Sequence, residues 1–89
     1  MPWDYELSGG AIRNLERLGP SVTLAVKRYL DKRIKGAPDP RAFGKPLRHG
    51  LKGLWRYRVG DYRLLCRLED RRLVVLVVEV GHRSTVYGE

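Results

Sequence analysis

The segment Leu54–Arg67 restricts the fold more than any other part of the chain, because two runs of alternating side chains flank a Gly-Asp pair. It reads Leu-Trp-Arg-Tyr-Arg-Val, then Gly60-Asp61, then Tyr-Arg-Leu-Leu-Cys-Arg. Alternation of apolar and charged residues is typical of a strand with one buried face. Glycine at the first central position of a two-residue loop can supply the positive φ that the turn needs. The segment therefore predicts a β-hairpin.

A two-residue loop fixes the register of this hairpin and sorts its side chains onto two faces. It puts Val59 opposite Tyr62 and Arg58 opposite Arg63. One face is apolar and carries Trp55, Tyr57, Val59, Tyr62, Leu64 and Cys66. The other face carries Arg56, Arg58, Arg63 and Arg67. Like charges directly opposite each other destabilise a sheet by roughly 0.2–1 kcal/mol per pair, so the cluster indicates a face that binds an anion.

Two helices are expected ahead of the hairpin. Ser8 can cap a helix that runs to about Leu18 and ends at Gly19. Pro20 can open a second helix at a position where its missing N–H costs nothing. Apolar residues at helical spacing continue from there to Gly36, which suits a C-cap.

Two further strands complete the expected fold. Alternation in residues 3–7 predicts a short first strand, and a turn at Asp70-Arg71 leads into a fourth strand over residues 72–80. Residues 43–50 are expected to be irregular and basic. The chain therefore predicts one α+β domain over residues 1–89, with two N-terminal helices packed on one face of a small, mainly antiparallel four-stranded sheet.

The end of the chain bears on the same face. In the predicted register Val80 lies beside Asp61, so the tail can bring Arg83 and Tyr87 back towards the hairpin. The arginine face also carries apolar residues, namely Leu65, Val74, Leu76 and Val78. Either a partner helix or a loop of this chain can cover them.

Charge points to a polyanionic partner. The formal net charge is +8, and the stretch from residue 45 to residue 67 holds seven basic residues and one acid. Concentrated positive charge favours nucleic acid by counterion release. Lys45, Arg48 and Lys52 are expected to contact an RNA backbone rather than to take part in chemistry. The competing interpretation is a surface that only confers solubility.

Several other chemistries lack a pattern in this sequence. The two histidines, His49 and His82, do not stand at ligand spacing from a second His or Cys, so no metal or other cofactor is expected. Cys66, the single cysteine, is expected to pack in the core. No segment resembles a signal peptide or a membrane span, so we expect a cytoplasmic protein.

Arginines suit chemistry on a phosphodiester, because they bind phosphate bidentately and stay charged. RNA carries its own nucleophile, the 2′-hydroxyl, and a protein that aligns it with the next phosphate can cleave without a metal. Such a reaction needs a proton acceptor for the 2′-hydroxyl and a donor for the departing 5′-oxygen. Tyr87 can stack on a base.

Two motifs carry a resemblance to a known family. The run Gly-Leu-Trp-Arg-Tyr-Arg-Val-Gly-Asp-Tyr-Arg-Leu and the ending Gly-His-Arg-x-x-Val-Tyr, together with the order of the elements, resemble the RelE branch of the RelE/ParE toxins over nearly the whole chain. The resemblance implies a metal-independent endoribonuclease toxin that cuts messenger RNA in the ribosomal A site. It also implies a cognate, RelB-like antitoxin that neutralises the toxin.

The resemblance assigns roles by position. Arg56 and Arg58 occupy strand sites where the best-known members have lysines, and Arg63 matches the phosphate-binding arginine after the turn. Arg83 matches the arginine proposed to protonate the leaving oxygen, and Tyr87 matches the tail tyrosine that stacks on or orients the messenger. One of the family lysines is a proposed general base. Arg58 holds that position here, and because a guanidinium keeps its proton at neutral pH it is a poor base, so Tyr87, water or the ribosome remain as acceptors.

Two rival functions belong to other classes. A ParE-like toxin would poison DNA gyrase and catalyse nothing itself, although Arg83 and Tyr87 argue against that branch. A plain nucleic-acid-binding module would bind in a salt-sensitive way and leave growth normal.

Overall fold

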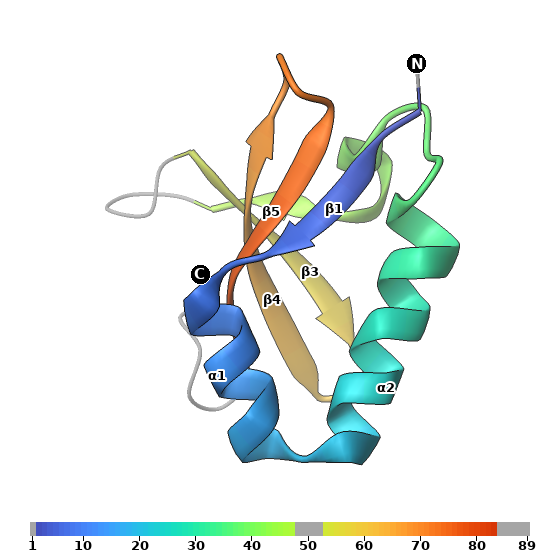
Figure 1. Cartoon of the computed structure of the whole chain (residues 1–89). Coiled ribbons are helices and arrows are strands. Elements are labelled where there is room, and N and C mark those ends of the chain that lie inside the picture. Colours follow the sequence, from blue (N-terminus) through green and yellow to red (C-terminus); the bar gives the residue numbers. More distant parts are fainter. Residues whose placement is uncertain (1, 48–52, 84–89) are drawn as a thin grey trace.

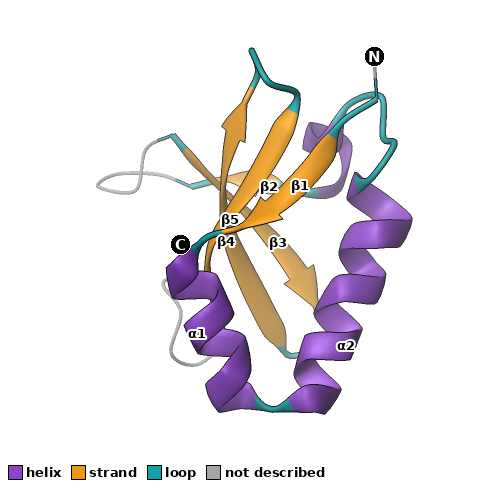
Figure 2. Ribbon diagram, viewed as in Figure 1, coloured by secondary structure: helices purple, strands orange, loops and turns teal. Residues whose placement is uncertain are grey.

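Five strands form one mixed sheet, and two helices lie against one of its faces (Figures 1 and 2). The computed structural model describes residues 2–47 and 53–83. The strands are β1 (Asp4–Leu7), β2 (Lys45–Pro46), β3 (Leu54–Val59), β4 (Tyr62–Glu69) and β5 (Val74–His82). Their order is β1-β5-β4-β3-β2, with β1 parallel to β5 and the other neighbours antiparallel. The predicted α+β class is confirmed.

The predicted number of strands was wrong. Residues 43–50 were expected to be irregular, but Lys45–Pro46 pairs with β3 and adds a fifth strand at the edge of the sheet. Two residues are too few to produce an alternating pattern, and proline is typical only of an edge strand. The short 3-10 helix η2 (Pro40–Phe43) leads into β2.

The helices begin and end as the sequence predicts. The Ser8 hydroxyl oxygen accepts a hydrogen bond from the Ala11 N–H at 3.1 Å and caps α1 (Gly9–Leu18). Gly19, with a φ of 99°, separates α1 from α2 (Pro20–Tyr29). A π-helical turn, η1 (Leu30–Ile34), extends α2, and the chain turns away at Gly36. Among the described residues, no helix is long and apolar enough to cross a membrane.

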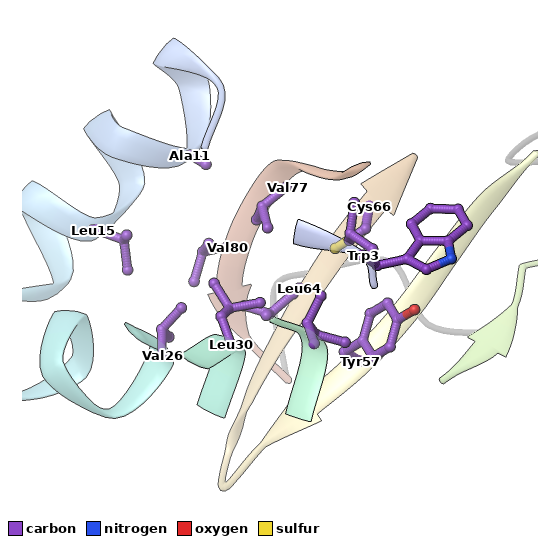
Figure 3. Packing of buried hydrophobic residues seen from close by; sticks show 12 residues of the cluster. Trp3, Ala11, Leu15, Val26, Leu30, Tyr57, Leu64, Cys66, Val77 and Val80 are labelled. Carbon is purple, nitrogen blue, oxygen red and sulfur yellow. The ribbon is translucent and has the colours of Figure 1, made fainter. Parts of the chain in front are cut away.

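The main core lies between the helices and the apolar face of the hairpin (Figure 3). Its buried residues include Leu15, Val26, Leu30, Tyr57, Leu64, Cys66, Val75 and Val77. The Tyr57 hydroxyl donates to the carbonyl oxygen of Pro40 at 2.9 Å, so η2 is anchored on the sheet. Burial raises the pKa of the Cys66 thiol, which therefore stays protonated and packs as a small apolar side chain.

A second, smaller apolar cluster lies on the arginine face. Leu47 and Leu65 are buried there and contact Leu54 and Val78. Leu47 follows β2, and its N–H donates to the carbonyl oxygen of Leu54 at 2.9 Å. The sequence analysis left open whether a partner helix or a loop of this chain covers the apolar residues of the arginine face. Over Leu65, the cover is a segment of this chain, at Leu47.

The turn between β4 and β5 differs from the prediction. Glu69 pairs with Val74, so four residues rather than Asp70-Arg71 alone form the turn. A register shift between Leu65 and Cys66 adds a further offset. The sequence analysis treated residues 72–80 as one regularly alternating strand and missed both insertions. In the structure, Val75 and Val77 are followed in the core by Val80, three residues further on, so the register shift interrupts the alternation. Together the two insertions leave Val80 beside Leu64 and bring Arg83, three residues later, beside the hairpin turn.

Candidate nucleic-acid interface

The Gly60-Asp61 turn sets the geometry of the candidate site. Gly60 has a φ of +60°, a backbone conformation that glycine adopts at little cost. The turn pairs Val59 with Tyr62 and Arg58 with Arg63, and this register of β3 and β4 is the predicted one. The hairpin prediction is therefore confirmed at every pair between the turn and Trp55.

Basic residues gather on the face opposite the helices. Arg58 and Arg63 are direct cross-strand partners, so their Cβ atoms lie about 4.5–5.5 Å apart. Lys45 is the cross-strand partner of Arg56, two residues along β3 from Arg58. We call these four residues, with Arg83, the cationic face.

Arg63 is the member of the cationic face with the most informative environment. Its side chain is half-buried, and its Nε is buried without a hydrogen-bond partner among the described residues. It forms no ion pair with Asp61 in the part of the chain that the structure describes, although that pairing was a simple alternative to function. On β5 its cross-strand neighbour is Gly81, which has no side chain to cover it. A buried guanidinium N–H without an acceptor costs about 1–3 kcal/mol. Because Arg63 is only half-buried, an anionic ligand would meet the open part of its side chain rather than Nε.

Arg83 lies at the same end of the sheet. Its side chain is exposed, and its backbone N–H donates to the carbonyl oxygen of Asp61 at 2.8 Å. The predicted register put Val80 at this place, but Val80 pairs with Leu64 instead. The correction brings Arg83 directly beside the hairpin turn. Because it follows Gly81 by two residues, regular alternation puts it on the side of the sheet that carries Arg63.

The remaining predicted residues separate into two groups. Arg67 pairs with Leu54 and Leu76 at the far end of β4, so it is not part of the cationic face. Arg48, Lys52 and Tyr87 lie outside the described residues.

A polar hollow beside β3 was missed by the sequence analysis. It has a volume of about 160 Å³ and is lined by Phe43, Gly44, Lys45, Arg56 and Arg58. A Cβ atom on Gly44 would lie 2.8 Å from the carbonyl oxygen of Arg56, so only glycine lets β2 approach β3 this closely. Nothing in the sequence pattern marks this close approach, because Phe43 and Arg58 are fifteen residues apart in the chain.

Other side chains near the turn were also missed or misplaced. His82 is half-buried in β5 and packs edge-on against Tyr62, with ring centroids 5.5 Å apart. Glu79 pairs with Leu65 in the sheet, and it lines a hollow of about 380 Å³ with Asn14 and Arg17 of α1. A larger hollow of about 550 Å³ lies along α1 and α2, away from the cationic face. No group of three or more His, Cys, Asp or Glu among the described residues could hold a metal ion.

Comparison with known proteins gives a consistent answer. The family model of the ParE toxin of type II toxin–antitoxin systems matches residues 5–87. The chain belongs to this family. It is 34% identical to the toxin RelG of Mycobacterium tuberculosis over 98% of both chains, and 30% identical to the toxin RelE of that organism, with 97% of this chain and 87% of RelE covered. It is therefore a RelE/RelG-type toxin of a toxin–antitoxin system, as the hairpin and tail motifs suggested.

Solved structures agree with this assignment. The toxin–antitoxin complex RelBE2 of M. tuberculosis contains a chain with a TM-score of 0.83 and 34% identity, and the match covers 93% of this chain and all of that one. A double arginine-to-alanine mutant of Escherichia coli RelE in the free state has a TM-score of 0.70 and 26% identity over 92% of this chain and 84% of that chain. Both structures therefore share the fold of this chain.

Proposed function

We propose that this toxin is an endoribonuclease that cuts messenger RNA in the ribosomal A site, by metal-independent attack of the 2′-hydroxyl. The observation that carries the proposal is the pair Arg58–Arg63, held side by side at the hairpin end with the Nε of Arg63 lacking an acceptor. Arg83 lies at the same end through the bond to Asp61. A scissile phosphate at this point would be within reach of three guanidinium groups.

The proposed reaction is an in-line displacement at phosphorus. The 2′-oxygen forms a bond to phosphorus, and the bond from phosphorus to the 5′-oxygen breaks, which leaves a 2′,3′-cyclic phosphate or, after hydrolysis, a 3′-phosphate, and a 5′-hydroxyl. Negative charge grows on the non-bridging oxygens in the transition state, and fixed guanidinium donors stabilise it. Arg58 and Arg63 take this role in the proposal, and Arg83 gives a proton to the departing oxygen.

Proton removal from the 2′-hydroxyl falls to another group. Arg58 holds the position of a family lysine, but a guanidinium keeps its proton at neutral pH and is therefore a poor base. The proposal assigns this step to Tyr87, to water or to a ribosomal group. Tyr87 is also the proposed stacking residue for the messenger, and Arg48 and Lys52 remain proposed backbone contacts.

The proposal includes a cognate, RelB-like antitoxin that neutralises the toxin, and action in the cytoplasm, where ribosomes are. A relative of 34% identity was solved in a toxin–antitoxin complex. The formal net charge of +8 would favour an acidic partner chain. Co-expression with the product of a neighbouring small acidic gene should restore the growth that the toxin alone arrests.

Primer extension on translated messenger tests the nuclease directly. Wild-type protein should produce cuts within the A-site codon, whereas Arg63→Ala and Arg83→Ala should each reduce them by about 10²–10³-fold, the usual effect of removing one transition-state donor. Arg71→Ala is the matched control, because Arg71 is exposed in the turn at the opposite end of the sheet. Cuts that are absent from wild type, or equally strong in all four proteins, would contradict the proposal.

A second candidate is inhibition of DNA gyrase, because the matching family model is that of the ParE toxins. Accumulation of cleaved gyrase–DNA complexes with intact messenger would identify that function. If neither messenger nor gyrase is affected, and binding to nucleic acid is only salt-sensitive, the protein is a non-catalytic binding module.

A further inference from the structure

The outer edge of β3 is open where β2 ends. The residues of β2 pair with β3 only at Arg56 and Trp55, so no strand pairs with β3 beside Arg58 among the described residues. The hollow of about 160 Å³ lies here, between the end of η2 and the side chains of Lys45, Arg56 and Arg58. In the part of the chain that the structure describes, three cations and no carboxylate line it, so the hollow has the charge of an anion subsite.

An exposed aromatic ring borders this hollow. Phe43 is the only phenylalanine in the chain, and 41% of it is exposed. It is the most exposed aromatic residue in the described part of the chain, where every tyrosine and tryptophan is buried or half-buried. The guanidinium of Arg33 lies 5.8 Å from the ring centroid, which orients the ring and adds a further positive charge.

We propose that the hollow is a nucleotide subsite for single-stranded RNA, in which a base stacks on Phe43 and the phosphate of that nucleotide contacts Lys45 and Arg56. This inference rests on the proposed nuclease function and adds a second point of contact with its substrate. Stacking on an aromatic ring beside a positively charged groove is how proteins bind single strands. A base in a duplex has both faces covered, so the subsite selects unpaired nucleotides.

The subsite adjoins the scissile phosphate rather than coinciding with it. Arg56 and Arg58 are two residues apart on β3, which corresponds to about 7 Å along a strand. Arg58 lines the hollow and is also the cross-strand partner of Arg63. A strand of RNA can therefore pass over Arg58 from the hollow to Arg63. The base on Phe43 therefore belongs to a nucleotide next to the cleaved bond, and it helps to fix the messenger in register.

Binding to programmed ribosomes tests the ring itself. The messenger carries a 2′-deoxy nucleotide at the cut site so that it stays intact. Phe43→Ala and Phe43→Leu should weaken binding of the toxin by about 5- to 100-fold, the range for loss of one base–aromatic stack. Phe43→Tyr should restore binding, since it keeps the ring. Leu24→Ala removes another exposed apolar side chain, this one from α2, and should leave binding unchanged.

Messengers that lack one base can distinguish stacking on Phe43 from a purely structural role of its ring. The same messengers are made with a single abasic nucleotide, moved one position at a time near the cut site. At one position the abasic site should lower the affinity of wild-type protein as much as the substitution Phe43→Ala does. The same abasic site should not lower the affinity of Phe43→Ala any further. Equal losses in both proteins at every position, or full binding by Phe43→Leu, would overturn the inference.

The failure of this inference can be told apart from failure of the proposed function. Messenger cleavage that depends on Arg63 but is unaffected in Phe43→Ala would overturn the subsite and leave the nuclease standing. Base-specific coupling to Phe43 without any cleavage of normal messenger would support the subsite and contradict the nuclease. If wild-type protein does not bind programmed ribosomes, both fail.

Discussion

The two ends of the sheet use arginine in opposite ways. At the β4–β5 turn, Arg41 donates two hydrogen bonds to Asp70 at 3.0 and 2.9 Å, and Arg72 pairs with both Glu6 and Glu69 at 2.6 Å. At the Gly60 turn, Arg58 instead faces Arg63, and neither has a carboxylate partner among the described residues. One end neutralises its guanidinium groups internally, and the other sets Arg58 and Arg63 side by side without a carboxylate partner among the described residues.

The ion-paired end of the sheet, at the β4–β5 turn, connects parts of the chain that are far apart in sequence. The Arg41 guanidinium lies 5.9 Å from the ring centroid of Trp3 and 5.7 Å from that of Trp55. With the bond to Asp70, this one side chain contacts the start of the chain, the start of β3 and the β4–β5 turn. Such contacts favour the fold, whereas like charges at the cationic face oppose it. Mutations at the two ends should therefore change stability with opposite signs.

Arg63→Met should have the largest effect and separates function from stability. Methionine keeps an unbranched apolar side chain but removes the charge and the buried Nε without an acceptor. Cleavage should fall by about 100-fold or more, while the free energy of unfolding should rise by about 1 kcal/mol. Messenger cleavage and urea denaturation measure the two quantities.

Arg67→Met is the control for that experiment, because Arg67 lies on the same strand and the same face but at the far end of β4. It should leave cleavage within about twofold and change stability by no more than about 0.5 kcal/mol. A loss of stability in Arg63→Met would mean that Arg63 supports the fold, and the contrast between the two ends would fail.

The difference between the ends also explains what the sequence could predict. The pairing of Arg58 with Arg63 follows from alternation and a Gly-Asp turn, both of which are local signals. The position of Arg83 was predicted near the turn, but through a wrong register, because a four-residue turn and a register shift offset each strand position. The contacts of Arg41 could not be predicted at all, since Asp70 lies 29 residues away in the chain.

Tyr57→Phe tests whether the two ends are joined through η2. The Tyr57 hydroxyl donates to the carbonyl oxygen of Pro40, next to Arg41 and a few residues before Lys45. Because the bond is buried, removing its donor leaves a carbonyl oxygen without a partner, and stability should fall by about 1–3 kcal/mol. If η2 also positions Lys45, the salt dependence of RNA binding should weaken; unchanged salt dependence would show that the ends act independently.

Arg41→Ala should lower stability without affecting the chemistry. The variant loses two cation–π contacts, each worth about 0.5–1 kcal/mol at an exposed site, so the free energy of unfolding should fall by about 1 kcal/mol or somewhat more. Measured at a temperature where the variant is fully folded, messenger cleavage should equal that of wild type. A specific loss of cleavage would give Arg41 a role at the cationic face that its contacts do not predict.

Asp70→Asn should have the smallest effect on stability, and that effect should disappear in acid. The hydrogen bond and charge of Arg41 hold the pKa of the Asp70 carboxyl below its ordinary value of 3.8. A carboxyl whose pKa is lower in the folded state stabilises the protein above its unfolded pKa, and this contribution disappears as the pH falls through the folded value. Urea midpoints of wild type and Asp70→Asn should therefore differ at neutral pH and converge in acid, below about pH 4. In an Arg41→Ala background the two should run parallel, because the guanidinium that lowers the pKa is gone; convergence that persists there would assign the shift to another group.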